Sequence, residues 1–409
     1  MKTNNCAGPV NTSNRYVVLD ALRGFALMGI VLANFPEFSL WTFLTTSQQN
    51  IFSTAEIDTT LCWWMSFLID GKFYTIFSIL FGIGFSIILE RAMQKGTNGL
   101  KIFYRRMFVL LLFGVMHMML LWSGDILLLY AVIGMLLPLF RKMKTRSLLY
   151  CALFFLILPI GVETWRMLSG LNLADWLYDK WWEVAFNQGI TEEEFSTWLR
   201  DVKKYACVNA FLIQGAVERM WEFVEGHRYF KVLGLFLIGY AIGKERIVQN
   251  LNQHKKMLKK IFVVTIMIGL PISVVYAWSC TNYHEWGGLV HNILYTYSVY
   301  PLGFAYISGF CLMYLKWNNS SVWRYLSYPG RMALSCYISQ SVIGMCLFYG
   351  IGFGLGAKIG LCYTLLIATF VFVLQIVVSS LWLRYYRFGP LEWLWRMLTY
   401  GKYFRIKLD

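Results

Sequence analysis

Charged side chains are scarce in this sequence. Asp, Glu, Lys and Arg make up 14% of its 409 residues, whereas a soluble globular domain contains about a quarter. Hydrophobic residues make up 58%, and they are gathered in long runs. These proportions exclude a soluble globular protein and predict an all-α, polytopic membrane helical bundle.

Two further patterns are absent. None of the nine cysteines forms a Cys-x-x-Cys pair, and most fall within apolar segments. We therefore expect the cysteines to be small apolar core residues, and we expect no disulfide framework, zinc site or other metal site. Residues 1–14 are polar and lack the apolar core of a cleavable signal peptide, so the first apolar helix is expected to act as an uncleaved insertion signal.

The apolar runs have the length of membrane-spanning helices. A span needs about 20 mostly apolar residues, because an α-helix rises about 1.5 Å per residue. This criterion predicts about ten spans. One of them, at 126–140, is short, and either a tilted or a partly interfacial helix fits it. The predicted spans are 17–36, 66–90, 106–122, 126–140, 147–168, 229–243, 258–279, 288–314, 330–350 and 357–384.

Positive charge predicts the orientation of these spans. The net charge of +15 raises the question of nucleic acid, but the basic residues lie in short clusters between apolar runs, as in cytoplasmic loops. No nucleic-acid partner is therefore expected. Every basic cluster falls on one side if both termini are cytoplasmic, and the intervening loops are poor in Lys and Arg. The clusters lie within 91–106, 141–146, 244–260, 316–324 and 384–407.

One polar segment interrupts the series of spans. Residues 170–228 carry ten of the 22 acidic residues, and Thr191 to Glu194 have the spacing of a capping box, which predicts a helix start. We expect a small external helical insert. The chain then divides into a cytoplasmic N-terminus (1–16), an N-terminal transmembrane bundle (17–169), the insert (170–228), a C-terminal transmembrane bundle (229–385) and a cytoplasmic interfacial tail (386–409).

Ionisable groups in the first span are the first functional candidates, because such groups are costly inside a membrane. Asp20 and Arg23 are three residues apart and share a helix face near its start. Asn34 lies about three turns further along the helix. An internal ion pair that pins the helix is one interpretation. An arginine that binds an anionic phosphate is the other.

A histidine and a carboxylate form the second candidate. His117 lies in the external half of its predicted span, and Asp125 follows at a tight hairpin. Asp125 can cap the next helix at Ile126, or it can hold the imidazole in one tautomer as in catalytic pairs. A hydrogen-bonded packing histidine is the alternative interpretation of His117.

Two more segments carry polar residues within apolar runs. Asp70-Gly71-Lys72 either ends the second span or breaks it, and Lys72 either snorkels to the interface or contributes to a binding site. The ninth predicted span carries a polar stripe, which should face neighbouring helices or a cavity. Its polar residues are Arg331, Tyr337, Gln340 and Ser341.

At these residues the sequence resembles the YeiB-like family of bacterial membrane proteins, the domain of unknown function 418 group. The matching strings follow the family order along nearly the whole chain, and the insert is the least similar part. They are Leu19-Asp20-Ala21-Leu22-Arg23-Gly24-Phe25-Ala26, Gly71-Lys72-Phe73, Leu80-Phe81-Gly82-Ile83-Gly84, His117 with Trp122-Ser123-Gly124-Asp125-Ile126-Leu127, Gly330-Arg331-Met332-Ala333-Leu334-Ser335, and Gly389-Pro390-Leu391-Glu392-Trp393-Leu394-Trp395-Arg396.

The family is similar to membrane acyltransferases, such as the lysosomal heparan-alpha-glucosaminide N-acetyltransferase. The resemblance implies a multi-pass protein of the bacterial inner membrane that moves an acyl (acetyl) group from cytoplasmic acyl-CoA to an external hydroxyl or amine. The acceptor would be a glycan or a lipid-linked group. In those enzymes an Asn on the first helix and a nearby His serve the transfer. Asn34 matches the former by position, whereas no His follows it closely and His117 lies on another span.

The first functional hypothesis is therefore an acyltransferase. Arg23 and Arg331 would bind the phosphates of coenzyme A. His117 would be the general base oriented by Asp125, and Asn34 would donate a hydrogen bond to the oxyanion. Membrane lipids are further expected partners, and the sequence does not decide between a monomer and a homodimer. The other residues assigned to donor binding are Asp20, Lys72, Tyr337 and Gln340.

The second hypothesis is a transporter or exporter of a small anionic or lipid-like molecule. Buried Arg23, Arg331, Lys72 and Asp125 would then line its path. The sequence shows neither inverted repeats nor paired broken helices, which often mark transporters. A structural or sensory protein without a small-molecule site is a third interpretation.

Overall fold

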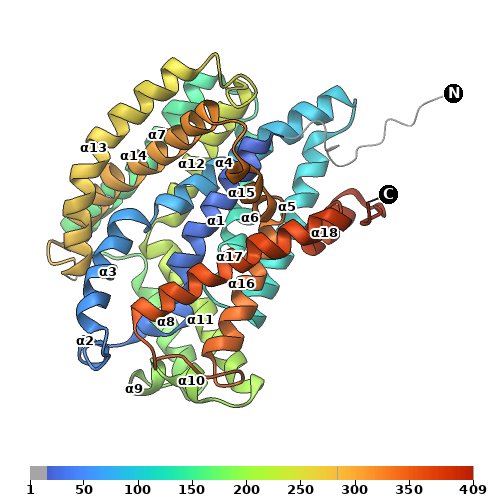
Figure 1. The fold of residues 1–409 in the computed structure, drawn as a ribbon. Coiled ribbons are helices and arrows are strands. Elements are labelled where there is room, and N and C mark those ends of the chain that lie inside the picture. Colours follow the sequence, from blue (N-terminus) through green and yellow to red (C-terminus); the bar gives the residue numbers. More distant parts are fainter. Residues whose placement is uncertain (1–15, 283, 409) are drawn as a thin grey trace.

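The protein is a helical bundle, as a computed structural model of residues 16–282 and 284–408 shows (Figure 1). The described residues contain no β-strand beyond an isolated bridge between Tyr386 and Lys407. The predicted all-α class is confirmed. Most of the predicted polar N-terminus, residues 1–15, lies outside the described residues.

Within the described part of the chain, seven helices are long and apolar enough to cross a membrane. Two shorter helices, α15 and α16, make an eighth crossing if they are counted together, although they meet at a 74° bend. A multi-pass membrane protein is thus confirmed. The seven are α1 (Val17–Phe38), α3 with α4 (Ala55–Leu68 and Lys72–Gln94), α5 (Gly99–Leu120), α7 (Thr145–Ser169), α13 (Lys255–Thr281), α14 (Gly287–Lys316) and α17 (Leu361–Tyr385), and the bent pair is α15 (Ser321–Arg331) with α16 (Ala333–Phe348).

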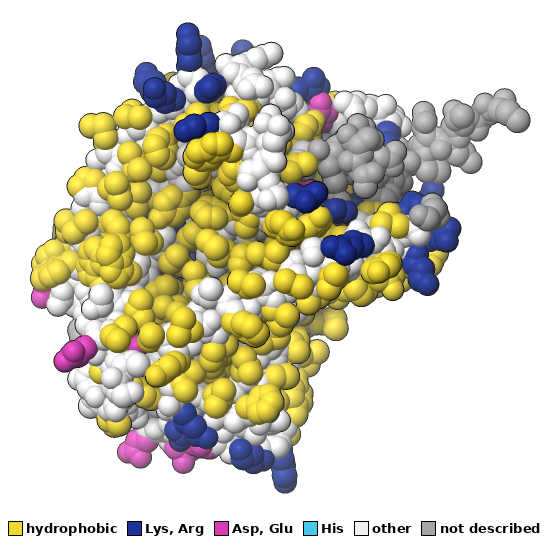
Figure 2. Space-filling model, in the orientation of Figure 1, with side chains coloured by type: hydrophobic (Ala, Val, Ile, Leu, Met, Phe, Trp, Pro, Cys, Tyr) yellow, Lys and Arg dark blue, Asp and Glu magenta, His cyan; other side chains and the backbone are white. Residues whose placement is uncertain are grey.

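The outer surface of these helices is apolar. Figure 2 shows hydrophobic side chains over the middle of the visible face, with Lys and Arg at its upper and right-hand margins and both basic and acidic side chains at its lower end. Met267 of α13 and Phe370 of α17 are each about two-thirds exposed. Large apolar side chains exposed in this way are suited to contact with lipid.

Two further predicted spans coincide with shorter helices. The run at 126–140 forms α6 (Leu127–Gly134) and a 3₁₀ turn, η3 (Leu137–Phe140). The run at 229–243 forms α12 (Arg228–Lys244), which is buried between α4 and α7. Close packing explains that burial, because Gly239 lies directly against the backbone of Ile79 in α4.

The basic clusters gather at one end of the bundle, which we call the basic end. Arg246 pairs with Glu90 at the end of α4. Lys244 donates to the Met143 carbonyl at 2.6 Å. Arg106 lies 3.6 Å from the ring of Trp395, which belongs to the C-terminal helix α18 (Pro390–Tyr400). Loops far apart in the sequence are therefore neighbours here.

The polar insert lies at the opposite end, which we call the insert end (bottom of Figure 1). A helix begins after Thr191 as predicted, although the Thr191 side chain forms no capping hydrogen bond and the helix is four residues long. The short elements η2 (Trp41–Phe43) and α2 (Thr46–Gln49) follow α1. The insert helices are α8 (Asp175–Asn187), α9 (Glu192–Phe195), α10 (Trp198–Asp201) and α11 (Tyr205–Glu225).

Candidate functional site

A cavity of about 850 Å³ lies inside the bundle, which is within the usual size range of small-molecule sites. At the basic end it is lined by Arg23, Arg106 and Arg331, and toward the insert end by Glu37 and Asp70. Because one cavity contacts residues of both ends, it can bring together ligands that approach from opposite sides of a membrane.

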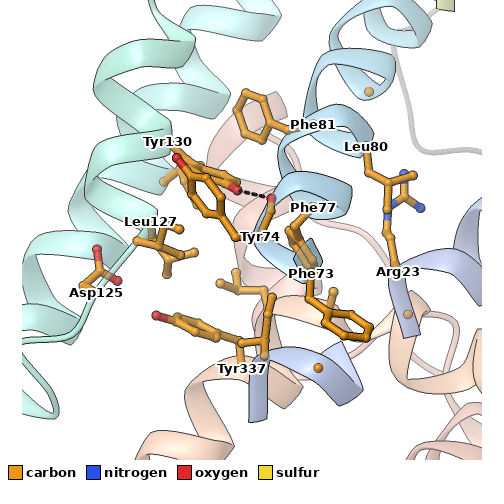
Figure 3. Close-up of a pocket in the computed structure, with 18 of the residues that line it drawn as sticks. Arg23, Phe73, Tyr74, Phe77, Leu80, Phe81, Asp125, Leu127, Tyr130 and Tyr337 are labelled. Atoms are coloured by element: carbon orange, nitrogen blue, oxygen red, sulfur yellow. Dashed lines mark hydrogen bonds between the residues drawn. The ribbon is translucent and has the colours of Figure 1, made fainter. Parts of the chain in front are cut away.

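The middle of the cavity is aromatic. Figure 3 shows Asp125 and Tyr337 on one side of this space and Arg23 on the other, with the Phe77 and Tyr74 side chains between them. The Tyr130 hydroxyl bonds to Ser78 at 2.6 Å, which holds its ring in place. This section suits an uncharged, extended group and not a phosphate.

The two predicted arginines lie at the same end of the cavity. Arg23 donates to Asp20 at 2.6 Å, and its side chain still lines the cavity. Both interpretations of Arg23 are therefore compatible with its geometry. Arg331 reaches the same cavity because Gly330 packs directly on the Asp20 carbonyl, which brings α15 against α1.

The C-terminal helix α18 closes this end. Glu392 accepts hydrogen bonds from the backbone N–H groups of Leu334 and Ser335 at 2.7 and 3.0 Å, so it caps the start of α16. Burial raises the pKa of Glu392, and the bonds from Ser335 oppose that rise. Arg331 is thereby placed beside a fixed helix junction.

Three buried side chains form a connected relay between α5, the α5–α6 hairpin and α16. The Nδ1 atom of His117 lies 2.8 Å from Asp125, as predicted, and its Nε2 atom lies 2.7 Å from the Ser341 hydroxyl. Asp125 also accepts from the Leu128 N–H at 2.7 Å, so it satisfies an N–H group in the first turn of α6 from the position before the N-cap residue Ile126. The two alternatives for Asp125 thus occur together.

The relay meets the cavity at Asp125. Asp125 and Tyr337 line the cavity, whereas neither His117 nor Ser341 does, although the structure describes both. All three members of the relay are buried, with exposed fractions of 2% for His117, 1% for Ser341 and 1% for Asp125. The Tyr337 ring lies 5.1 Å from the imidazole, centroid to centroid. Asp125 is therefore the member of the relay that borders the cavity, and its side chain is as enclosed as the imidazole.

The insert also contributes to the cavity, which the sequence did not indicate. Asn34 and Glu37 of α1 line it, together with Arg219 of α11. Arg219 lies 3.2 Å from Glu37 and donates to the Ser123 carbonyl at 3.1 Å. Burial lowers the pKa of Arg219, but the carboxylates of Glu222 and Glu37 outweigh this and raise it. Arg219 therefore remains a cation at the edge of the cavity.

Two predicted binding residues, both in the described part of the chain, do not line the cavity. The Lys72 side chain is fully buried, donates to the Ser66 carbonyl at 2.6 Å and lies over the Tyr276 ring. It therefore does not snorkel. Gln340 donates to Gln375 of α17 at 2.9 Å. Both side chains stabilise helix packing around the cavity.

Comparisons with known proteins identify the family and the relatives of this chain. A family model described as "Protein of unknown function (DUF418)" matches residues 242–402. The chain is 31% identical to the uncharacterized protein YxaH of Bacillus subtilis, over 96% of each chain. It is 27% identical to the uncharacterized protein YeiB of Escherichia coli, over 94% of this chain and 96% of that one. No solved structure matches it.

Proposed function

This chain belongs to the YeiB-like DUF418 family of membrane proteins, and from that premise we propose that it is a membrane acyltransferase. It takes an acyl group, such as acetyl, from acyl-CoA and passes it to a hydroxyl or amine on the other side of the membrane. The observation that supports this most strongly is the shared cavity, which is lined by Arg23 and Arg331 at one end and by Asn34 and Asp125 further along.

The proposed orientation places the basic end in the cytoplasm of a bacterium, with the chain in the inner membrane and both termini inside. It is supported by the gathering of the basic loops, such as the contact of Arg246 with Glu90, at one end of the bundle. Ten crossings result if the bent pair α15 with α16 is counted as one span and α12 and α6 with η3 are counted as short or tilted spans.

In this proposal the donor enters from the basic end. The guanidinium groups of Arg23 and Arg331 bind its phosphates, because such charge-assisted bonds are strong and can be bidentate. The aromatic section around Phe77 and Tyr130 receives the uncharged pantetheine arm and carries the thioester toward Asp125. Acyl-CoA thus matches the cavity in its order of charged and apolar parts.

The transfer itself follows from the groups beside Asp125. The acceptor oxygen or nitrogen attacks the thioester carbonyl and loses its proton to the Asp125–His117 pair. The Asn34 amide donates to the oxyanion that forms. When this intermediate collapses, the carbon–sulfur bond breaks. The Asp125–His117 pair then gives its proton to the coenzyme A thiolate and returns to its starting state.

Purified protein incubated with acetyl-CoA labelled in the acetyl group tests this function. Wild-type protein should bind the donor and should release coenzyme A faster in the presence of a bacterial lipid and glycan extract, with label appearing in the extract. Asp125→Asn should still bind the donor but should not transfer the label. If the wild type neither binds nor consumes acetyl-CoA, acyl transfer is wrong.

A second candidate function is transport of a small anion. Two apolar helices are broken beside the cavity, at Asp70 between α3 and α4 and at Met332 between α15 and α16. Breaks of this kind are typical of secondary transporters. The sequence offered the break at Asp70 as one of two alternatives and did not indicate the break at Met332. Flux of an anionic solute in proteoliposomes that persists in Asp125→Asn would favour transport, whereas acyl transfer abolished by that change would favour the enzyme.

A further inference from the structure

Three metal-ligating side chains meet where α13 turns into α14. Cys280 lies in the last turn of α13, His284 in the connecting loop and His291 near the start of α14. Their candidate donor atoms all lie within 4.8 Å of one another. We propose that this cluster binds a divalent metal ion of the zinc class.

The spacing of the two histidine donor atoms fits such an ion. The Nδ1 atoms of His284 and His291 are 3.0 Å apart. Two nitrogen ligands at about 2.0–2.1 Å from a tetrahedral zinc ion are separated by ~3.3 Å. The imidazoles would therefore move by only a few tenths of an ångström. Zinc binds well to imidazole nitrogen and thiolate sulfur, whereas Mg²⁺ and Ca²⁺ prefer oxygen ligands.

The loop backbone adopts an unusual conformation at one of these ligands. His284 has a φ of 52°, in the left-handed region that is uncommon for residues other than glycine. This conformation lets the imidazole turn back to contact His291 of the following helix. Outliers of this kind are often found where a side chain is held for binding.

The charges around the cluster can accommodate the ion. Zinc with one thiolate and two neutral imidazoles carries one net positive charge. The carboxylate of Asp70, which accepts a hydrogen bond from Tyr276, lines the same part of the cavity and can offset that charge. The Nζ atom of the buried Lys231 lies 4.0 Å from the centre of the Tyr295 ring, which can offset a positive charge there.

The site would keep one open coordination position. The cluster supplies three ligands, whereas a closed structural zinc site has four. Cys280, His284 and His291 all line the central cavity, so the open position would face whatever the cavity holds, at minimum a water molecule. This binding site does not depend on acyl transfer, because it can be occupied and measured without any substrate.

Cobalt(II) titration of the full-length protein in detergent tests the site. The protein carries a purification tag without histidine and is first stripped with a chelator. We expect one cobalt ion per chain, with a thiolate-to-cobalt charge-transfer band and d–d bands of tetrahedral intensity, both displaced by zinc. Cys280→Ser should remove the charge-transfer band, and His291→Ala should lower the affinity by ~10-fold or more.

Matched controls separate this site from others. Cys346→Ser changes an exposed cysteine elsewhere, and His254→Gln changes a histidine at the start of α13; both should bind cobalt as the wild type does. His284→Gln alters an exposed side chain, so it tests the site even if the variants at the half-buried Cys280 and His291 fail to fold. The proposal is overturned if the wild type binds no stoichiometric cobalt, or if binding is unchanged in folded Cys280→Ser and His284→Gln.

Discussion

The Nδ1 atom of His117 lies 2.8 Å from Oδ1 of Asp125, and the remaining ring nitrogen lies 2.7 Å from the Ser341 hydroxyl. Both nitrogens are held, so the orientation of the imidazole is fixed. Because Asp125 is the one member of this relay that lines the cavity, it is the group that faces the acceptor in our proposal, and His117 positions it and shares its proton.

Replacing Asp125 tests the role of the carboxylate. Asp125→Asn keeps the shape of the side chain but removes the proton acceptor, so transfer should fall by about 10²–10⁴-fold. The affinity for acyl-CoA should change little, because the phosphates bind at the other end of the cavity. Steady-state kinetics and donor binding measure the two effects separately.

A second buried carboxylate supplies the control for that change. Asp58 is 2% exposed and accepts from Thr54 and from the Cys362 N–H, but it does not belong to the residues described as lining the cavity. Asp58→Asn should lower stability without the large loss of turnover. Equal losses of turnover in the two variants would contradict the role given to Asp125.

His117 and Ser341 should differ in effect although they are neighbours. His117→Gln removes the proton-sharing ring, so kcat should fall by about 10²-fold or more and the pH dependence of kcat/KM should change shape. Ser341→Ala removes one orienting bond and should cost about 10-fold or less. The pH profile is the decisive readout, because a purely structural role for His117 would lower the activity at every pH without changing the shape of the profile.

The arginines of the basic end should control donor affinity. Arg23→Gln or Arg331→Gln should raise the KM for acyl-CoA by ~10-fold or more, since a hydrogen bond to a charged group contributes about 1.5–3 kcal/mol. Arg324→Gln changes an exposed arginine of α15 outside the cavity and is the matched control. Were all three variants to bind the donor like the wild type, the phosphate site would have to lie elsewhere.

The contact of α1 with α15 should tolerate no added side-chain carbon. A Cβ at residue 330 would lie 1.8 Å from the Asp20 carbonyl oxygen, so Gly330→Ala should destabilise the protein by about 1–3 kcal/mol or more. Gly161 of α7 has no atom within 4 Å of such a Cβ. Gly161→Ala should therefore be neutral or slightly stabilising. Thermal unfolding in detergent compares them, and equal melting temperatures would contradict the close contact.

The sequence predicted those features that depend on local pattern. The apolar runs gave the helical class and most helix positions, and the pairing of His117 with Asp125 was foreseeable because a tight hairpin joins residues eight positions apart. Ser341 was recognised only as part of a polar stripe, since it lies 224 residues from His117. Tertiary packing alone decides such a contact.

The sequence patterns did not decide three other features of the structure. The break at Asp70 was one of two alternatives, and the apolar residues on both sides of it resemble a single span. The cysteines were interpreted as apolar core residues without a metal site, because Cys280 and His291 lack a recognised ligand spacing and meet only through the α13–α14 hairpin. Arg219 of the insert reaches Glu37 of α1 across 182 residues.

The central claim is that donor and acceptor reach one cavity from opposite sides of the membrane. Its most direct test uses proteoliposomes in which the orientation of the protein is determined by protease access to the C-terminal tail, with labelled acetyl-CoA supplied on one side only. We predict that label is transferred to an acceptor extract on the opposite side only when acetyl-CoA is on the side of the basic end, and that Asp125→Asn abolishes it. Transfer that is independent of the side of addition, or absent in the wild type while acetyl-CoA stays intact, would contradict the account.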